Sequence, residues 1–132
     1  MKKQILLILV LLPFLLVNCS RDHSTGPQIT ITLEQAEEIL LTEVLQDSVP
    51  GGIMVYELQQ PVEKFSVIRS WQNKYIIAGK CWFFFIDDYF YANWAHPCRY
   101  VLVNFYDEQG MSFEIIDETS PPGFENLVVV EF

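Results

Sequence analysis

Residues 82–86 (WFFFI) constrain the fold of this chain more than any other segment. A strand with one face in water alternates apolar and polar residues, but this run is apolar throughout. The run therefore predicts a central strand that is buried on both faces. The chain has 132 residues, which is enough for one domain and not for two.

A helix is expected before this strand, because apolar residues recur at helical spacing after Thr32. Thr32 is a favourable N-cap, and residues 47–52 (DSVPGG) end the pattern after about 13 residues. The apolar stripe of the helix is expected to pack on residues of later strands. The stripe is Leu33, Ala36, Leu40 and Val44, and the expected partners are Val101, Val103 and Phe105.

The rest of the chain predicts strands, at residues 53–58, 65–71, 74–78, 82–86, 99–106, 111–117 and 127–130. Gln72 and Asn73 predict a tight turn, in which Asn73 would tolerate a positive φ. Residues 107–110 (DEQG) predict the turn of a second hairpin. One N-terminal helix packed on an antiparallel sheet of about four to six strands gives an α+β fold in two layers.

The first residues predict a targeting segment. Lys2 and Lys3 precede an apolar stretch that is shorter than the roughly 20 residues of a membrane span, which indicates a signal peptide. Residues 16–20 (LVNCS) resemble the lipobox of bacterial lipoproteins. Asn18 departs from the Gly, Ala or Ser usual at its position, and an ordinary secretory peptide with a chance cysteine is the alternative.

The lipobox resemblance implies that Cys19 becomes the N-terminus and carries acyl chains. Such chains would anchor the protein in the membrane of a bacterial cell envelope. Ser20 follows the cysteine, and similarity to enterobacterial sorting implies the outer membrane. Residues 1–18 are then a signal peptide, residues 19–28 a flexible tether, and residues 29–132 a single small domain.

The part of the chain after the signal peptide is strongly acidic. Residues 19–132 contain all 17 Asp and Glu but 6 of the 8 Lys and Arg, which gives a formal charge of −11. This charge argues against nucleic acid as a partner, because clustered Lys and Arg neutralise phosphates in such complexes. It also argues against electrostatic docking of the domain on anionic lipid.

The order of a helix, a strand and hairpins, with residues 32–36 (TLEQA) opening the helix, resembles that of PepSY-like domains. Such domains occur as protease propeptides and in cell-envelope proteins. The resemblance implies an inhibitory or chaperone-type role. A long aromatic insert between strands departs from the pattern of that family.

That insert, residues 87–97 (DDYFYANWAHP), is the first candidate for function. Tyr89, Tyr91, Trp94 and His96 lie in a predicted loop, where exposed aromatic side chains mark binding surfaces. Flat aromatic faces suit sugar rings or apolar peptide segments, so the expected partner is a glycan or a protein. The alternative is that the loop folds down as a lid and packs these side chains.

The sequence does not indicate catalytic chemistry. It has no Gly-rich phosphate loop, nucleophile elbow or metal-ligand spacing, so we expect no catalytic residue, cofactor or metal. Asp87 and Asp88 are expected to solvate a strand end. An enzyme around His96 is the least favoured alternative and would need His96 buried beside a carboxylate or Cys98. The expected function is that of a non-catalytic interaction or ligand-binding module.

Cys81 and Cys98 are candidates for a disulfide, because an oxidising compartment favours thiol pairing. A bridge needs Cα atoms within about 7 Å. A simple hairpin of residues 82–86 with residues 99–106 would hold the two cysteines farther apart than that. The bridge therefore requires the aromatic insert to fold back, and it excludes the simple hairpin.

Overall fold

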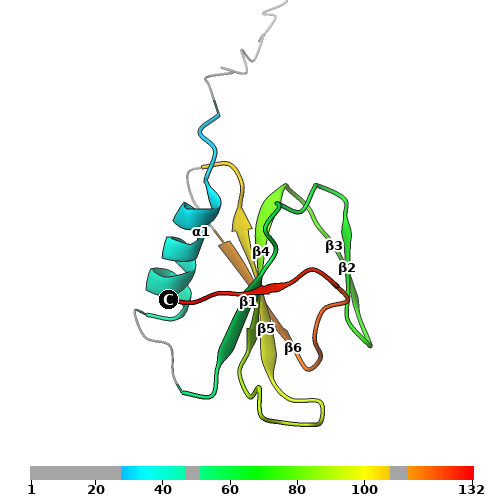
Figure 1. Cartoon of the computed structure of the whole chain (residues 1–132). Coiled ribbons are helices and arrows are strands. Elements are labelled where there is room, and N and C mark those ends of the chain that lie inside the picture. Colours follow the sequence, from blue (N-terminus) through cyan, green and yellow to red (C-terminus); the bar gives the residue numbers. More distant parts are fainter. Residues whose placement is uncertain (1–27, 47–50, 108–112) are drawn as a thin grey trace, which may run out of the picture.

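The computed structural model describes residues 28–46, 51–107 and 113–132. Its centre is an antiparallel sheet in the order β6-β5-β4-β1-β7 (Figure 1). The strands of this sheet are β1 (Met54–Glu57), β4 (Cys81–Asp87), β5 (Cys98–Asn104), β6 (Phe113–Glu118) and β7 (Val128–Val129). A hairpin of β2 (Val67–Arg69) and β3 (Lys74–Ile76) forms a second, two-stranded sheet. The predicted α+β class is confirmed.

The predicted helix begins at Thr32. The Thr32 hydroxyl accepts from the backbone N–H of Gln35, and the Gln35 side chain accepts from the backbone N–H of Thr32. This reciprocal pair is a capping box, which satisfies two N–H groups at the helix start. Segment α1 (Leu33–Ile39) continues directly into a π-helical segment, η1 (Leu40–Val44).

One face of the five-stranded sheet packs on the helix. Ala36 and Leu40 are fully buried there. Trp82 Nε1 donates to the Ile31 carbonyl at 2.8 Å, which fastens the start of the helix to β4. This core contains every residue predicted for the contact, namely Leu33, Ala36, Leu40, Val44, Val101, Val103 and Phe105.

The opposite face of the sheet is covered by the β2–β3 hairpin. Phe83 and Tyr100 pack there with Ile68 of β2 and with Ile77. Because the helix and the hairpin cover opposite faces, residues 81–86 of β4 are all buried, as the apolar run predicted. The hairpin adds a layer that the expected helix-on-sheet arrangement does not contain.

The turn of the β2–β3 hairpin differs from the prediction. Arg69 pairs with Lys74, so the connection has four residues, 70–73, and not two. Asn73 does not have a positive φ. The reason lies in Ser70, whose hydroxyl accepts from the backbone N–H groups of Gln72 and Asn73 and supports a wider turn.

The two ends of the β4–β5 ladder carry different parts of the chain. At one end Thr30 bridges Tyr106, and the Ile29 carbonyl accepts from the N–H of Asp107. At the other end residues 88–97 connect the two strands. Seven paired positions separate these ends, which corresponds to about 20 Å of strand. Figure 1 shows the described segment that leads into α1, in blue, above the sheet and the connecting loop at the bottom.

Candidate functional site

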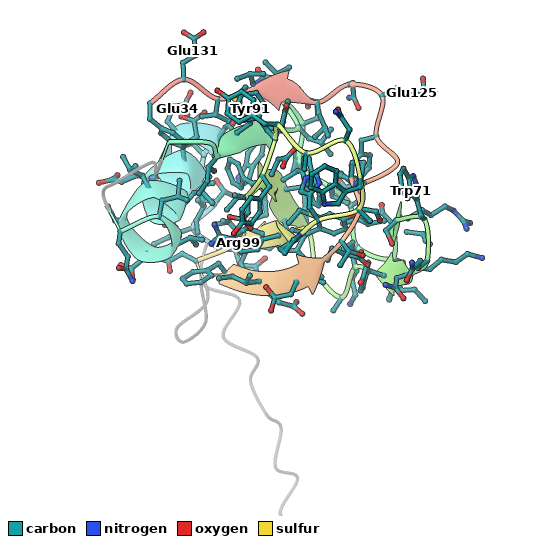
Figure 2. All side chains as sticks on the ribbon, turned by 90° about the horizontal axis from the view of Figure 1, so that it is seen from below. Glu34, Trp71, Tyr91, Arg99, Glu125 and Glu131 are labelled. Atoms are coloured by element: carbon teal, nitrogen blue, oxygen red, sulfur yellow. The ribbon has the colours of Figure 1, made fainter. Side chains whose placement is uncertain are left out.

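Residues 88–97, which we call the aromatic loop, project from the end of the sheet that lies away from the N-terminal segment. Trp94 is 72% exposed, Tyr91 77% and Tyr89 60%. Figure 2 looks at the molecule from below and labels Tyr91 over the sheet and Trp71 on the hairpin. The loop therefore does not pack these three side chains as a lid.

Two ion pairs fasten the base of the aromatic loop. Arg99 donates to both carboxylate oxygens of Asp88, from Nε at 2.9 Å and from Nη2 at 2.6 Å. His96 Nε2 lies 2.7 Å from Asp87 Oδ1. The expectation that the two aspartates solvate a strand end is wrong, because neighbouring residues on the strands point to opposite faces and each aspartate meets a different cation.

His96 also contacts the backbone of the loop that contains it. Its Nδ1 lies 2.6 Å from the Trp94 carbonyl oxygen, so both ring nitrogens face acceptors. The Trp94 carbonyl raises the pKa of His96, and the Asp87 carboxylate raises it further, because both stabilise the protonated ring. The imidazolium thus links the strand end to the backbone at Trp94.

An enzyme around His96 required this residue to be buried beside a carboxylate. His96 lies beside the Asp87 carboxylate but is only half-buried, so the condition is met in part. However, both ring nitrogens are engaged, so the ring has none left to exchange a proton with a substrate in this conformation. Cys98 donates its thiol to the Ser120 carbonyl, and burial raises the pKa of Cys98 to about 12. Neither side chain is poised for catalysis.

Three hollows lie in a row across this end of the molecule. The first, of about 310 Å³, is lined by Tyr91, Trp94 and Gly52, whose φ of 95° favours glycine. The second, of about 280 Å³, shares Trp94 with the first and adds His96 and Pro97. The third, of about 420 Å³, shares Pro97 with the second and is otherwise lined by residues with polar side chains. Its other lining residues are Gln72, Asn73, Asp117, Glu118 and Thr119.

Glu118 organises the polar hollow, and no sequence pattern predicted it. Its Oε1 accepts from Tyr75 at 2.6 Å, Asn73 at 2.6 Å and Ser70 at 3.0 Å, and its Oε2 accepts from the N–H of Thr119. Burial alone would raise the pKa of Glu118, but these hydrogen bonds outweigh it and lower the pKa to about 2. The carboxylate ties the hairpin turn to the end of β6.

The candidate disulfide between Cys81 and Cys98 is absent, and both buried cysteines are free thiols. In the register of β4 with β5, Cys98 lies opposite Asp87, while Cys81 lies opposite Asn104. The two cysteines thus stand at opposite ends of a simple hairpin. This agrees with the expectation that the simple hairpin and the disulfide exclude each other. The aromatic loop is closed by Asp87 and Asp88 instead.

A second carboxylate is buried away from the aromatic loop. Glu57 on β1 is 4% exposed, and Gln59 Nε2 donates to its Oε1. Within the described residues its Oε2 has no donor, and the Glu37 carboxylate of α1 lies beside it. Burial, followed by the neighbouring Glu37, raises the pKa of Glu57 to about 7.

Cys19, the signal peptide and most of the tether lie outside the described residues, as do residues 108–112 of the predicted second turn. Among the residues that are described, no helix is long and apolar enough to cross a membrane. The comparisons with known proteins return no match: no family model, no curated protein and no solved structure matches the chain. The lipoprotein and PepSY-like resemblances therefore stay predictions.

Proposed function

We propose that this chain is a non-catalytic, lipid-anchored protein of the bacterial cell envelope that binds a ligand through the aromatic loop. The observation that carries the proposal is the outward placement of Tyr89, Tyr91 and Trp94 on a loop fastened by two ion pairs. Side chains that remain in water add nothing to the core of the domain. We therefore infer that these three aromatic side chains become buried against a partner.

The fixed base of the loop supports this proposal. Binding costs free energy when loops and side chains must be ordered, and a loop already held by Asp87 and Asp88 avoids part of that cost.

The position of the loop also supports the proposed binding function. The anchor would attach beyond Gln28, at the opposite end of the β4–β5 ladder, so the aromatic side chains would face away from the membrane attachment.

The lining of the three hollows favours a glycan over an apolar peptide as the ligand. Sugar rings stack their C–H faces on Trp and Tyr, and their hydroxyls bind amides and carboxylates. The row offers Trp94 and Tyr91 at one end and Asn73 and Asp117 at the other. An apolar peptide would leave the polar end of the row without a complementary surface.

The test compares two tryptophans at the same end of the molecule. Trp94→Ala should abolish capture of neutral oligosaccharides on a glycan array and leave the melting temperature nearly unchanged. Trp71→Ala is the matched control, because Trp71 is 76% exposed but does not line the hollows, and it should leave both properties unchanged. A destabilisation by Trp94→Ala of about 3–5 kcal/mol, the value of a large buried aromatic, would refute the binding surface.

The anchor is tested separately. Cys19→Ala should yield an unprocessed or soluble product that no longer sediments with membranes. If this variant is cleaved at the normal size and still sediments, the lipoprotein assignment is wrong. The glycan array uses the same chain with or without its anchor, so the outcome for ligand binding does not depend on this result.

A further inference from the structure

The β2–β3 hairpin has one face in the core and one face in water. Ile68 and Tyr75 point into the core, and the alternate positions point outward. Two cross-strand pairs make up the outer face: Val67 pairs with Ile76, and Arg69 pairs with Lys74. The outer face thus combines an apolar pair with a cationic pair.

Phe65 and Lys64 extend this outer face before β2 begins. Phe65 and Ile76 are each 71% exposed. Phe65 has a φ of 68°, a left-handed conformation that is unfavourable for a bulky residue, while its N–H donates to the Ile77 carbonyl. Lys64 Nζ lies 4.8 Å from the centre of the Phe65 ring. We call the set Lys64, Phe65, Val67, Arg69, Lys74 and Ile76 the basic hairpin face.

The cations of the acidic domain concentrate on this face. Among the described residues the basic side chains other than His96 are Lys64, Arg69, Lys74, Lys80 and Arg99. Lys80 pairs with Glu63, and Arg99 pairs with Asp88. The other three form no ion pair with any described residue, and all three lie on the basic hairpin face. Charges are screened over about 10 Å at ordinary salt, so a nearby surface senses this face more than the net charge of −11.

The face begins next to the point where the tether joins the domain. Gln28 and Lys64 line the same hollow, together with residues 78–80 between β3 and β4. Gln28 lies nine positions after Cys19, a length of chain that can span at most about 30 Å. A membrane that holds Cys19 is therefore within reach of Lys64, where the basic hairpin face begins. The Arg69–Lys74 pair lies at the other end of this face, beside the hairpin turn that shares a hollow with Pro97 of the aromatic loop.

We propose that the basic hairpin face rests on the anionic phospholipid surface of the membrane in which Cys19 is anchored. Lys64, Arg69 and Lys74 pair with phosphate headgroups, while Phe65, Val67 and Ile76 enter the boundary of the acyl region. The proposal rests on the proposed anchor for its geometry. It is an exception to the expectation from the net charge, because three cations without an ion pair to a described residue lie together on this face, while the neighbouring Glu63 pairs with Lys80 and Glu118 accepts hydrogen bonds from the hairpin.

The test uses the processed chain carrying Ile76→Cys, labelled with an environment-sensitive fluorophore and reconstituted into vesicles. Vesicles of equal parts phosphatidylglycerol and phosphatidylcholine should raise the emission at least about twofold over pure phosphatidylcholine, because the label then leaves water. Ile115→Cys on β6 is the matched control, an exposed isoleucine on another strand, and its label should not distinguish the two vesicles. Unmodified chain treated with the same reagent corrects for labelling at other cysteines.

Charge and salt then separate the possible causes. Lys64→Glu/Arg69→Glu/Lys74→Glu should remove the response to anionic vesicles, and raising the salt from about 0.1 M to about 1 M should weaken it. These residues are exposed, and an unchanged melting temperature would verify folding. Equal emission on both vesicles would overturn the proposal. A response to soluble polyglutamate but not to anionic vesicles would also overturn it, because the partner would then be an acidic chain. Glycan capture by the triple variant should be normal, so failure of this proposal leaves the aromatic loop unaffected.

Discussion

His96 and Asp87 meet at the base of the aromatic loop, where His96 Nε2 lies 2.7 Å from Asp87 Oδ1. The second nitrogen of the same ring lies 2.6 Å from the Trp94 carbonyl. One imidazole ring therefore positions the backbone at Trp94, the single tryptophan of the loop, relative to the end of β4. Replacing His96 should therefore change the stability of the protein by an amount that depends on pH.

His96→Gln should destabilise the protein more at acidic than at basic pH. The raised pKa of His96 means that the folded chain holds this proton more tightly than the unfolded chain. The stabilisation is complete below about pH 6.5, the ordinary value, and is lost as the pH rises through the folded pKa. Urea unfolding should show a loss of about 1–2 kcal/mol at about pH 5 and a smaller loss at about pH 9. An equal loss at both pH values would contradict the charged bridge.

Glu118→Gln should loosen the attachment of the hairpin turn to β6. The lowered pKa of Glu118, about 2 against 4.5, means that its stabilisation is complete above about pH 4.5 and is lost as the pH falls toward 2. The variant should lose about 2–3 kcal/mol of unfolding free energy at neutral pH and less in acid. Glu125→Gln, at an exposed residue, is the control and should change stability little. Similar effects of the two variants would refute the role of Glu118.

Glu57→Gln should stabilise the protein at neutral and higher pH. The folded pKa of Glu57, about 7, exceeds its ordinary value of 4.5, so the folded chain holds a proton that the unfolded chain releases. Stability therefore falls as the pH rises from about 4.5 to about 7, and the cost persists above that. Glutamine removes this cost, and thermal unfolding at about pH 8 should show a gain on the order of 1–2 kcal/mol. No gain at pH 8, or an equal gain at pH 4, would argue against the raised pKa of Glu57.

Leu40→Ala should remove a side chain that is fully buried between the helix and the sheet. The expected loss of unfolding free energy is about 2–5 kcal/mol, because the cavity adds to the loss of apolar burial. Leu41→Ala provides the comparison, since Leu41 is partly exposed and outside the core. Denaturant unfolding of both variants measures the difference, and a loss below about 0.5 kcal/mol for Leu40→Ala would contradict the packing.

Cys81 and Cys98 should titrate as free thiols after denaturation and resist thiol reagents before it. Both side chains are buried, and burial raises the pKa of each thiol to about 12, so the reactive thiolate is scarce in the folded chain. A colour-forming thiol reagent should report both cysteines in urea without a reductant. Detection of a crosslink between the two cysteines in the native chain would refute the register of β4 with β5.

The fold was largely predictable because its signals are local. The apolar run at residues 82–86 and the stripe containing Ala36 and Leu40 are read from neighbouring residues, and both match the observed burial. The missing layer was not predictable in this way. Whether the β2–β3 hairpin extends the main sheet or folds over its second face depends on contacts between Ile68 and residues far along the chain.

For the candidate site, too, local features could be predicted from the sequence, and contacts between distant residues could not. The sequence predicted a long aromatic loop but left open whether Trp94 packs or is exposed, and it did not predict the partners of Asp87 and Asp88. Neighbouring aspartates at a strand end point to opposite sides, so each meets a cation supplied by the returning strand or loop. Glu118 was missed because a buried carboxylate with four donors has no sequence spacing, and its donors lie more than 40 positions away except for Thr119.

The placement of the N-terminal segment and the aromatic loop at opposite ends of the β4–β5 ladder has a mechanical consequence. A partner held by the loop and a lipid held by Cys19 would pull on the domain along the direction of these strands. The aromatic loop joins β4 to β5 and would pull both strands in the same direction. The load would therefore cross the hydrogen bonds that join Ile29 and Ile31 to the residues after β5, and these bonds run across the direction of the pull and would share it in shear. The domain would then act as a stiff link between the membrane and whatever it holds.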